Sequence, residues 1–467
     1  MSETKVQKMA KIWEKYDGEA LEAFCGDYRS FITEHKTERE CVAGMRAVLG
    51  KSGAVDLADA ISEGIRPKTG DLFYTDLMKK TLIVFRIGKR PLTDGMQLLG
   101  AHIDSPRLDL KQHALYEDGD LALFETHYYG GIKKYQWVTL PLALHGVVAK
   151  KDGSVVTISV GENPEDPVFG VSDLLIHLAG KQMSKKLSEG IEGEKLNILV
   201  GSRPLAGDAK EPVKENILAI LKDRYGIEEE DFLSAEIEVV PAGAARDYGF
   251  DRSMIMGYGQ DDRVCAYPSF RAILDEETPE FTSVCLLTDK EEIGSVGATG
   301  MHSRFFENSV AELMNLTGCY SELNLRRVLT RTRVLSSDVS AAFDPDFPDV
   351  MEKNNCSYLG LGPVFNKYTG SRGKSGSNDA NAEYIAYLRN EMDAAGIVYQ
   401  SGELGKVDEG GGGTIAYILA NLGMQVIDFG VAVLNMHAPF EITSKADIYE
   451  AYRAYRVFLA SASEPRA

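Results

Sequence analysis

The feature that most constrains the fold is an alternation of helix-type segments and short apolar runs after Gly257. The helix-type segments are residues 264–274, 305–316, 378–395 and 414–422, and the apolar runs are residues 283–287, 333–336, 397–400 and 425–429, before a last helix at 445–460. Earlier apolar runs at 81–85 and 97–101 have the same character, and they follow about 65 residues of helical pattern. Such alternation predicts a sheet that is covered by helices on both faces.

The segment from residue 109 to residue 249 has a different pattern. Apolar stretches at 137–149 and 155–160 are closely spaced, as in a strand-rich fold, and two helical or loop segments follow at 174–187 and 213–221. We therefore predict an α/β protein with a second domain inserted into the first. Residues 1–108 and 250–467 would form the main domain with a helix-covered mixed sheet, and residues 109–249 would form the strand-rich insertion.

The charge and cysteine content narrow the class of protein. The chain has 70 Asp and Glu against 51 Lys and Arg, a net charge of −19, so phosphate backbones and anionic lipids would be repelled. Its apolar runs are shorter than the ~18 residues that a membrane span needs, and the N-terminus lacks the pattern of a signal peptide. The six cysteines are scattered without a CxxC pair, which predicts a reduced, cytoplasmic location.

Polar residues follow the apolar runs at the positions where α/β sheets bind their ligands, the carboxyl ends of the strands. These residues are His102, Asp104, Asp261, Glu291, Glu292, Asp338 and His437. Each has an ordinary structural explanation when taken alone: a capped strand end, a helix N-cap, a solvated charge run or a core histidine. Their recurrence along one domain favours a common site.

Two of these motifs have spacings that suit metal chemistry. His102 and Asp104 share one face of an extended segment, so the carboxylate can orient the imidazole of a metal ligand. The adjacent Glu291 and Glu292 point in different directions, so one can bind a metal while the other acts as general base. Imidazole and carboxylate ligands without thiolates favour a dinuclear Zn²⁺, Co²⁺ or Mn²⁺ site.

Five sequence segments together resemble the motifs of a known protein family. In order along the chain they are GAHIDSPRLDLK, the Asp261-Asp262-Arg263 segment, DKEEIGSVGATG, SSDVS and NMHAP. Their order and spacing resemble those of the aspartyl aminopeptidase and vacuolar aminopeptidase I family of dinuclear metallopeptidases. The resemblance covers nearly the whole chain, including the inserted domain.

The resemblance implies a role for each residue of the predicted site. Asp261 would bridge two ions, and the remaining metal ligands would be His102, Glu292, Asp338 and His437. Glu291 would be the general base, and Asp104 would orient His102. Related bridging aspartates are followed by a cis peptide bond, so the Asp261–Asp262 bond is predicted to be cis.

The implied activity is that of a cytoplasmic metallo-aminopeptidase, which removes N-terminal residues from peptides with a free amine. Its cofactors would be two divalent ions, with Zn²⁺ preferred and Co²⁺ or Mn²⁺ as alternatives. The resemblance also implies a homo-oligomer, a dodecamer built from dimers, with the inserted domain at the substrate and subunit contacts. Two alternatives stay open: a related amidohydrolase, such as a deacylase or carboxypeptidase, and a catalytically silent scaffold.

The sequence departs from the family where substrate selection is expected. Asp173 replaces the first histidine of a histidine pair, and residues 132–137 replace a Trp-rich stretch. Lys367, Arg372 and Lys374 offer cations near the expected position of a substrate-binding lysine. Because Asp173 would oppose an acidic side chain, we expect no strict preference for Asp or Glu.

The sequence does not support two other functional motifs, a phosphate-binding loop and a nucleophile elbow. Gly410–Gly413 precede Thr414 without the lysine of a phosphate-binding loop, so a flexible loop that enters a helix is the better interpretation. Ser295 lies in GSVG and not in the GxSxG of a nucleophile elbow.

Overall fold

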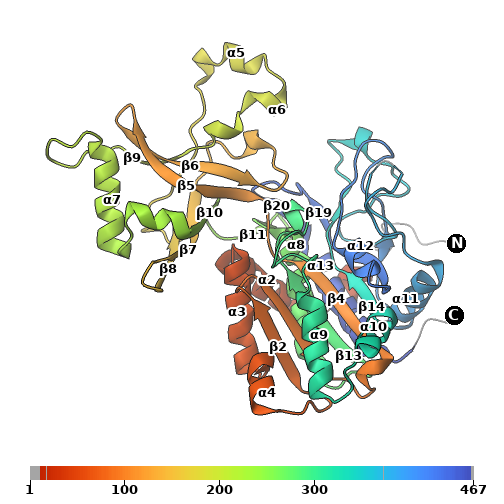
Figure 1. Cartoon of the computed structure of the whole chain (residues 1–467). Coiled ribbons are helices and arrows are strands. Elements are labelled where there is room, and N and C mark those ends of the chain that lie inside the picture. The colour runs from red at the N-terminus through yellow and green to blue at the C-terminus, as the bar shows by residue number, and fades with distance from the viewer. Residues whose placement is uncertain (1–10, 17, 372, 464–467) are drawn as a thin grey trace. The chain divides into compact units, whose positions relative to one another are not determined.

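The computed structural model describes residues 11–16, 18–371 and 373–463, and Figure 1 shows the chain as a cartoon. The chain divides into two compact units. Unit 1 comprises residues up to Asp104, Ala245–Met436 and the residues from Glu441 onward, and unit 2 comprises Ser105–Ala244 and His437–Phe440. Within the described part of the chain, each helix is too short or too polar to cross a membrane.

Unit 1 is built on a nine-stranded mixed sheet. In spatial order its strands are β1 (Val55–Asp56), β2 (Leu72–Leu77), β3 (Thr81–Arg86), β13 (Thr282–Thr288), β4 (Met96–His102), β14 (Arg333–Ser336), β18 (Gln425–Gly430), β16 (Val364–Asn366) and β17 (Gln400–Ser401). The four central strands β13, β4, β14 and β18 are parallel, so their carboxyl ends meet at one edge of the sheet. Several of the predicted site residues lie at or just after that edge.

Helices cover both faces of this sheet, as the alternating sequence predicts. One face packs against α2 (Gly18–Glu34), α3 (Glu38–Lys51), α8 (Gln260–Asp275), α11 (Ala382–Ala394) and α13 (Lys445–Ala460). The other packs against α4 (Leu57–Glu63), α9 (Phe305–Leu316), α10 (Glu322–Arg331) and α12 (Ala416–Ala420). Successive strand residues such as Leu98 and Leu99 belong to opposite cores, because side chains of a strand alternate between its faces.

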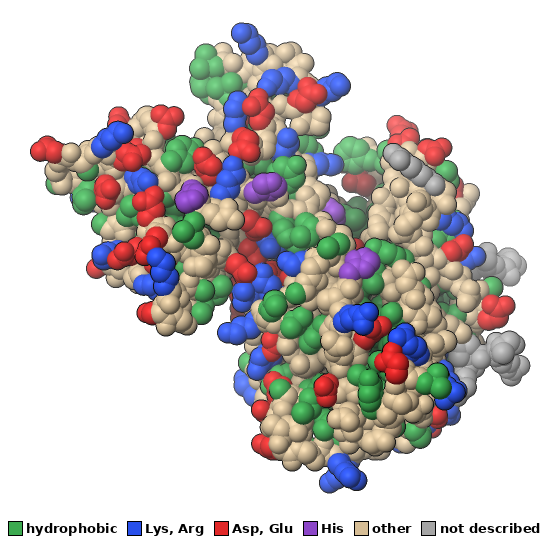
Figure 2. All heavy atoms as spheres, in the orientation of Figure 1, with side chains coloured by type: hydrophobic (Ala, Val, Ile, Leu, Met, Phe, Trp, Pro, Cys, Tyr) green, Lys and Arg blue, Asp and Glu red, His purple; other side chains and the backbone are tan. Residues whose placement is uncertain are grey.

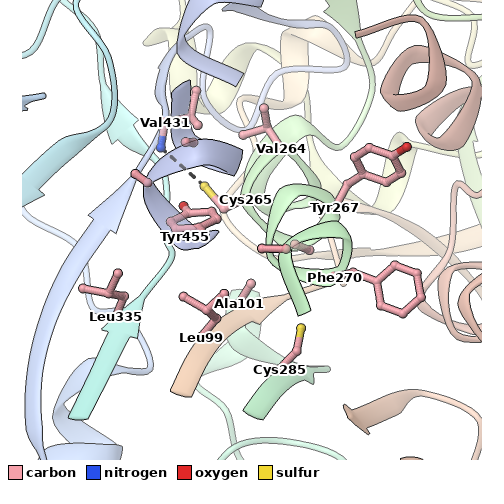
Figure 3. Close-up of a cluster of buried hydrophobic side chains, with 14 of the residues drawn as sticks. Leu99, Ala101, Val264, Cys265, Tyr267, Phe270, Cys285, Leu335, Val431 and Tyr455 are labelled. Atoms are coloured by element: carbon pink, nitrogen blue, oxygen red, sulfur yellow. Dashed lines mark hydrogen bonds between the residues drawn. The ribbon is translucent and has the colours of Figure 1, made fainter. Parts of the chain in front are cut away.

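Helix α8 lies directly against the sheet below its carboxyl edge. Figure 3 shows Cys265 of α8 among Leu99, Leu335 and Tyr455, with its Sγ 3.4 Å from the main-chain nitrogen of Val431. Burial raises the pKa of the Cys265 thiol well above its usual value, so this cysteine is a neutral packing residue. The packing fixes the start of α8, which carries Asp261 and Asp262.

A smaller five-stranded sheet completes unit 1. Its strands in spatial order are β11 (Arg246–Tyr248), β12 (Met254–Gly257), β20 (Glu441–Ser444), β19 (Ala432–Leu434) and β15 (Ser340–Ala341). In the β12–β20 pair, Gly257 lies opposite Glu441. The turn after β12 enters α8, so this pairing brings Glu441 close to the α8 N-terminus.

Unit 2 is a six-stranded antiparallel sheet with short helices. In spatial order its strands are β8 (Val155–Val160), β7 (Leu142–Ala149), β10 (Ala235–Pro241), β5 (Arg107–Asp118), β6 (Leu121–Tyr129) and β9 (Ile198–Gly201). Its helices are α5 (Gly180–Met183), α6 (Leu187–Gly190) and α7 (Pro212–Tyr225). A mostly apolar cavity of about 470 Å³ lies between the sheet and α7.

Two predicted strands differ from the observed ones. The run predicted at 397–400 is a strand only at Gln400–Ser401, because the main-chain nitrogens of Ile397 and Val398 donate to Met392 and to the Glu450 carboxylate. The stretch predicted from residue 137 forms a strand only from Leu142. The 3₁₀ turn Lys134–Gln136 is capped at Trp137, and a proline follows at residue 141, before β7 begins.

Candidate metal centre

The carboxyl edge of the central strands brings several predicted site residues together. His102 is the last residue of β4, and it lies beside Thr288, the last residue of β13, in the sheet register. Glu291 follows β13 after a turn of two residues, and Asp338 follows β14. Parallel strands that end at one edge deliver these side chains to one place.

The imidazole of His102 contacts two of the predicted carboxylates. Its Nε2 lies 3.2 Å from Oδ1 of Asp261, and its Nδ1 lies 3.0 Å from the main-chain oxygen and 3.3 Å from Oδ1 of Asp104. Burial by itself would lower the pKa of His102, but the hydrogen bonds to Asp104 and Asp261 raise it well above its usual value. The ring therefore lies with Nε2 toward Asp261 and Nδ1 toward Asp104.

Asp261 and Asp262 open helix α8, and the peptide bond between them is cis, as predicted. The main-chain nitrogen of Asp261 donates to Oε2 of Glu441 at 3.0 Å. The carboxylate of Asp262 accepts the main-chain N–H of His102 at 3.3 Å. Burial, and then the neighbouring Asp261, raise the pKa of Asp262, although the charge of His102 opposes this.

Asp104 also contacts the loop that follows β13. Its two carboxylate oxygens accept the main-chain N–H groups of Glu291 and Glu292, each at 3.2 Å. These glutamates begin a 3₁₀ turn, Glu291–Ile293, directly after Lys290, which has a left-handed φ of 68°. Asp104, which is fully buried, thus fixes both the histidine and the loop that carries the predicted general base.

The residues of this edge fit a divalent cation. One ligand atom each from His102, Asp261 and Asp338 lie within 4.8 Å of one another, and carboxylate oxygens of Asp261 and Glu292 also lie within that distance. Burial and the surrounding acids raise the pKa of Asp338, with Asp262 first among them. Acids gathered in a buried place repel one another, and a cation relieves that repulsion. Imidazole and carboxylate donors without a thiolate suit Zn²⁺, Co²⁺ or Mn²⁺.

His437 is the one predicted ligand that groups with unit 2. It begins the segment His437–Phe440, its Nδ1 lies 2.9 Å from the main-chain oxygen of Gly131, and its φ is 64°. Along the chain it follows β19 by three residues, and β20 begins at Glu441. Its role as a ligand remains a prediction.

The cations predicted for substrate selection have partners of their own. Lys374 Nζ lies 3.0 Å and Lys367 Nζ lies 3.8 Å from the carboxylate of Asp379. Lys367 also lines a cavity of about 1090 Å³ in unit 1 that none of the predicted metal ligands line. Arg372 lies outside the described residues. In unit 2, the Asp173 carboxylate accepts from the Leu174 nitrogen and the Gln182 side chain.

The sequence analysis missed two residues that hold Asp261. Both Gln260 and Glu441 are buried; the Glu441 carboxylate accepts the Asp261 main-chain N–H, and the Gln260 amide donates to the main-chain oxygen of Glu441. Gln260 stands directly before Asp261, and Glu441 stands four residues after His437. A glutamine before a helix start and a lone glutamate at a strand start carry no distinctive local signal, so only the folded geometry reveals them.

Comparison with known proteins gives a consistent result. A family described as "Aminopeptidase I zinc metalloprotease (M18)" matches residues 31–459. The probable M18 family aminopeptidase 1 of Clostridium acetobutylicum is 61% identical over 458 residues, which cover 97% of this chain and 98% of that protein.

Two solved structures extend the comparison. The crystal structure of an M18 family aminopeptidase from Thermotoga maritima has a TM-score of 0.92 at 46% identity, covering 96% of this chain and 98% of that one. The S. cerevisiae mApe1 dodecamer has a TM-score of 0.75 at 20% identity, covering 93% and 95%, which shows likeness of fold alone. The chain therefore belongs to the M18 family of zinc aminopeptidases.

Proposed function

We propose that this metallo-aminopeptidase works with two divalent ions that share the carboxylate of Asp261. The observation that carries the proposal is the position of that carboxylate, which lies within 4.8 Å of donor atoms from His102 and Asp338 and also of a Glu292 oxygen. His102, Asp338 and Asp261 would hold one ion, and Glu292, His437 and Asp261 would hold the other. When bound, such a pair polarises the scissile carbonyl, binds the substrate's free amine and acidifies a water molecule.

Glu291 is the proposed general base. Its Oε2 lies 3.9 Å from Nε2 of His102, and its main-chain nitrogen is held by Asp104. The carboxylate takes a proton from the attacking water, and the resulting acid gives this proton to the nitrogen of the leaving peptide. Because Glu292 is the next residue on the same turn, one backbone conformation can direct one carboxylate toward an ion and the other toward the water.

An aminopeptidase and a related amidohydrolase differ in their need for a free amine. The proposal predicts hydrolysis of aminoacyl substrates only when the N-terminus is unblocked. A panel of free and N-acetylated aminoacyl anilides, assayed after chelation and reloading with Zn²⁺, Co²⁺ or Mn²⁺, tests this. Release of aniline from the acetylated substrates at equal rates would instead favour an amidohydrolase that needs no free amine, and release of acetate would favour a deacylase.

We also propose that the chain forms a homo-oligomer through unit 2. Six large apolar side chains between residues 174 and 187 are 46–72% exposed, namely Leu174, Leu175, Ile176, Leu178, Met183 and Leu187. Large exposed apolar patches commonly mark subunit contacts. The solved mApe1 neighbour is a dodecamer, and a dodecamer built from dimers is the proposed state here. Native mass spectrometry tests it, and a monomer at micromolar concentration would refute it.

A cytoplasmic location is the last part of the proposal. All six cysteines are free thiols, and five of them are buried. Thiols persist in reducing compartments, where disulfides are rare. The visible face of the molecule carries acidic and basic side chains interspersed (Figure 2), as for a protein in aqueous surroundings. Fractionation of cells with a tagged chain tests the location.

A further inference from the structure

A buried polar network of Glu441, Gln260 and Thr443 lies next to the Asp261 main chain. None of these three residues is a predicted metal ligand or the predicted base. Glu441, the first residue of β20, is 1% exposed, and its Oε2 accepts the main-chain N–H of Asp261 at 3.0 Å. The Asp261 nitrogen lies in the first turn of α8, where main-chain N–H groups have no partner within the helix. Asp261 and Asp262 have non-helical φ/ψ angles there, and the Glu441 carboxylate satisfies the Asp261 N–H through a charge-assisted hydrogen bond.

Gln260, the residue before Asp261, joins the start of α8 to β12 and β20. Its amide nitrogen donates to the main-chain oxygens of Ile255, at 3.1 Å, and Glu441, at 2.6 Å. Its amide oxygen accepts the hydroxyl groups of Tyr28, at 3.3 Å, and Thr443. A side-chain amide can form two hydrogen bonds as donor and two as acceptor, so this completely buried amide is saturated.

The network joins residues that are distant in the sequence. Glu441 and Thr443 come from β20, Tyr28 from α2, and Gln260 from the start of α8. The β12–β20 pair, with Gly257 opposite Glu441, sets the distance between the two segments. The carboxylate that accepts the Asp261 N–H is therefore carried by a packed strand, and Gln260 joins that strand to α2 and to the start of α8.

We infer that Glu441 is a positioning residue, which holds the Asp261 main chain so that its carboxylate faces both ions. The inference rests on the proposed bridging role of Asp261. A purely structural role for Glu441 would affect only the stability of the fold. A positioning role also affects how tightly the ions bind, because misorienting a ligand weakens metal affinity about 10- to 100-fold.

Glu441→Gln tests the inference, and Glu450→Gln is its matched control. Glu450 is also a completely buried glutamate, and its Oε1 accepts a main-chain N–H, that of Val398, but it lies on α13 outside the metal centre. Both variants replace a charged acceptor by a neutral one. The readouts are the dissociation constants of Zn²⁺ from competition with a chelator, the visible absorption spectrum of the Co²⁺-loaded protein, and urea unfolding of the metal-free protein.

We expect Glu441→Gln to weaken Zn²⁺ binding about 10- to 100-fold and to change the Co²⁺ spectrum. Glu450→Gln should keep both properties and change only the unfolding midpoint. If Glu441→Gln does not fold, Thr443→Val, which removes one hydroxyl donor to the Gln260 amide oxygen, provides a milder variant with a smaller loss of affinity.

Two outcomes would contradict parts of the account separately. Unchanged Zn²⁺ affinity and Co²⁺ spectrum in folded Glu441→Gln would overturn the positioning role, whatever its stability. One bound ion per wild-type chain would instead overturn the shared carboxylate of the proposed function. In that case, weaker binding of the single ion in Glu441→Gln would still support a positioning role for Glu441.

Discussion

The strand-end cluster around His102 and the segment 366–379 both carry charged residues that the sequence analysis selected, yet they are built differently. In the cluster, His102, Asp104 and Asp261 are at most 3% exposed and hold one another or nearby main chain. In the segment, the side chains of Lys367 and Lys374 are 52% and 41% exposed, and both pair with Asp379.

This difference separates a site that the fold fixes from charges that solvent screens. Buried contacts cannot be replaced by water, so each residue of the cluster affects its neighbours strongly. Exposed ion pairs contribute about 0–1 kcal/mol and rearrange easily. The comparison therefore predicts large effects of substitutions at the sheet edge and small effects in the segment.

The largest effect is expected for Asp261→Ala. The variant should lose both ions, and kcat/KM should fall more than about 10⁴-fold, or about 5 kcal/mol, because both proposed ions share this carboxylate. Metal content by mass spectrometry and anilide hydrolysis measure the two losses. Asp251→Ala, an exposed aspartate in the same part of the chain, is the control and should keep both ions. Full occupancy in Asp261→Ala would remove the bridging role.

Glu291→Gln should separate catalysis from metal binding. Loss of the proposed base should lower kcat about 10²- to 10⁴-fold, while the metal content stays that of the wild type. Glu277→Gln, an exposed glutamate, should leave kcat unchanged. The idea fails if Glu291→Gln keeps more than half of the wild-type kcat at full metal occupancy.

The buried carboxylate of Asp428, on β18 of the central sheet, should make the free energy of unfolding depend on pH. Burial raises the pKa of Asp428 to about 6, although the Ser336 and Thr414 hydroxyls oppose this, whereas an unfolded aspartate has a pKa of about 3.9. Between these values the native state holds the proton that the unfolded state has lost. The contribution of Asp428 to the free energy of unfolding therefore falls as the pH rises from about 4 to about 6, by up to about 3 kcal/mol.

Asp428→Asn removes this titration. Relative to wild type, the variant should gain free energy of unfolding between pH 4 and pH 6, with no further change above that range. Urea unfolding at pH 4.5, 5.5 and 7.5 provides the comparison. Parallel stability curves for the two proteins would show that Asp428 does not titrate in this range.

Asp104→Asn tests how much the contacts from Asp104 to the Glu291–Glu292 main chain contribute to catalysis. An amide oxygen can replace only one of the two carboxylate oxygens that accept from Glu291 and Glu292. We expect kcat to fall about 10- to 100-fold, as for other groups that orient metal ligands, with KM nearly constant. A change in KM alone would mean that Asp104 acts on substrate binding.

The smallest effect is expected for Lys374→Ala combined with Lys367→Ala. Because both ammonium groups pair with Asp379, the ratio of kcat/KM for Asp- and Leu-anilides should change less than about 10-fold. A wild-type preference for Asp or Glu above about 100-fold, or 2.7 kcal/mol, that this double variant abolishes would contradict our expectation of no strict acidic specificity.

Local sequence patterns predicted much of the fold. Helix 305–316 and strand 333–336 were predicted with the observed bounds, since apolar periodicity determines which face is buried. The grouping of His102 with Asp338 could also be expected, because parallel strands end at one edge. The limits appear where contacts cross long separations: Asp104 holds Glu291 across 187 residues and Glu441 holds Asp261 across 180, and no local pattern encodes such pairs.

The central claim is that one carboxylate, that of Asp261, joins two metal ions. Anomalous X-ray diffraction at the zinc edge, from crystals of the zinc-loaded protein, tests it most directly. The account predicts two peaks per chain, about 3.5–4 Å apart, with an oxygen of Asp261 bound to each. A single peak, or two peaks of which Asp261 contacts only one, would contradict it.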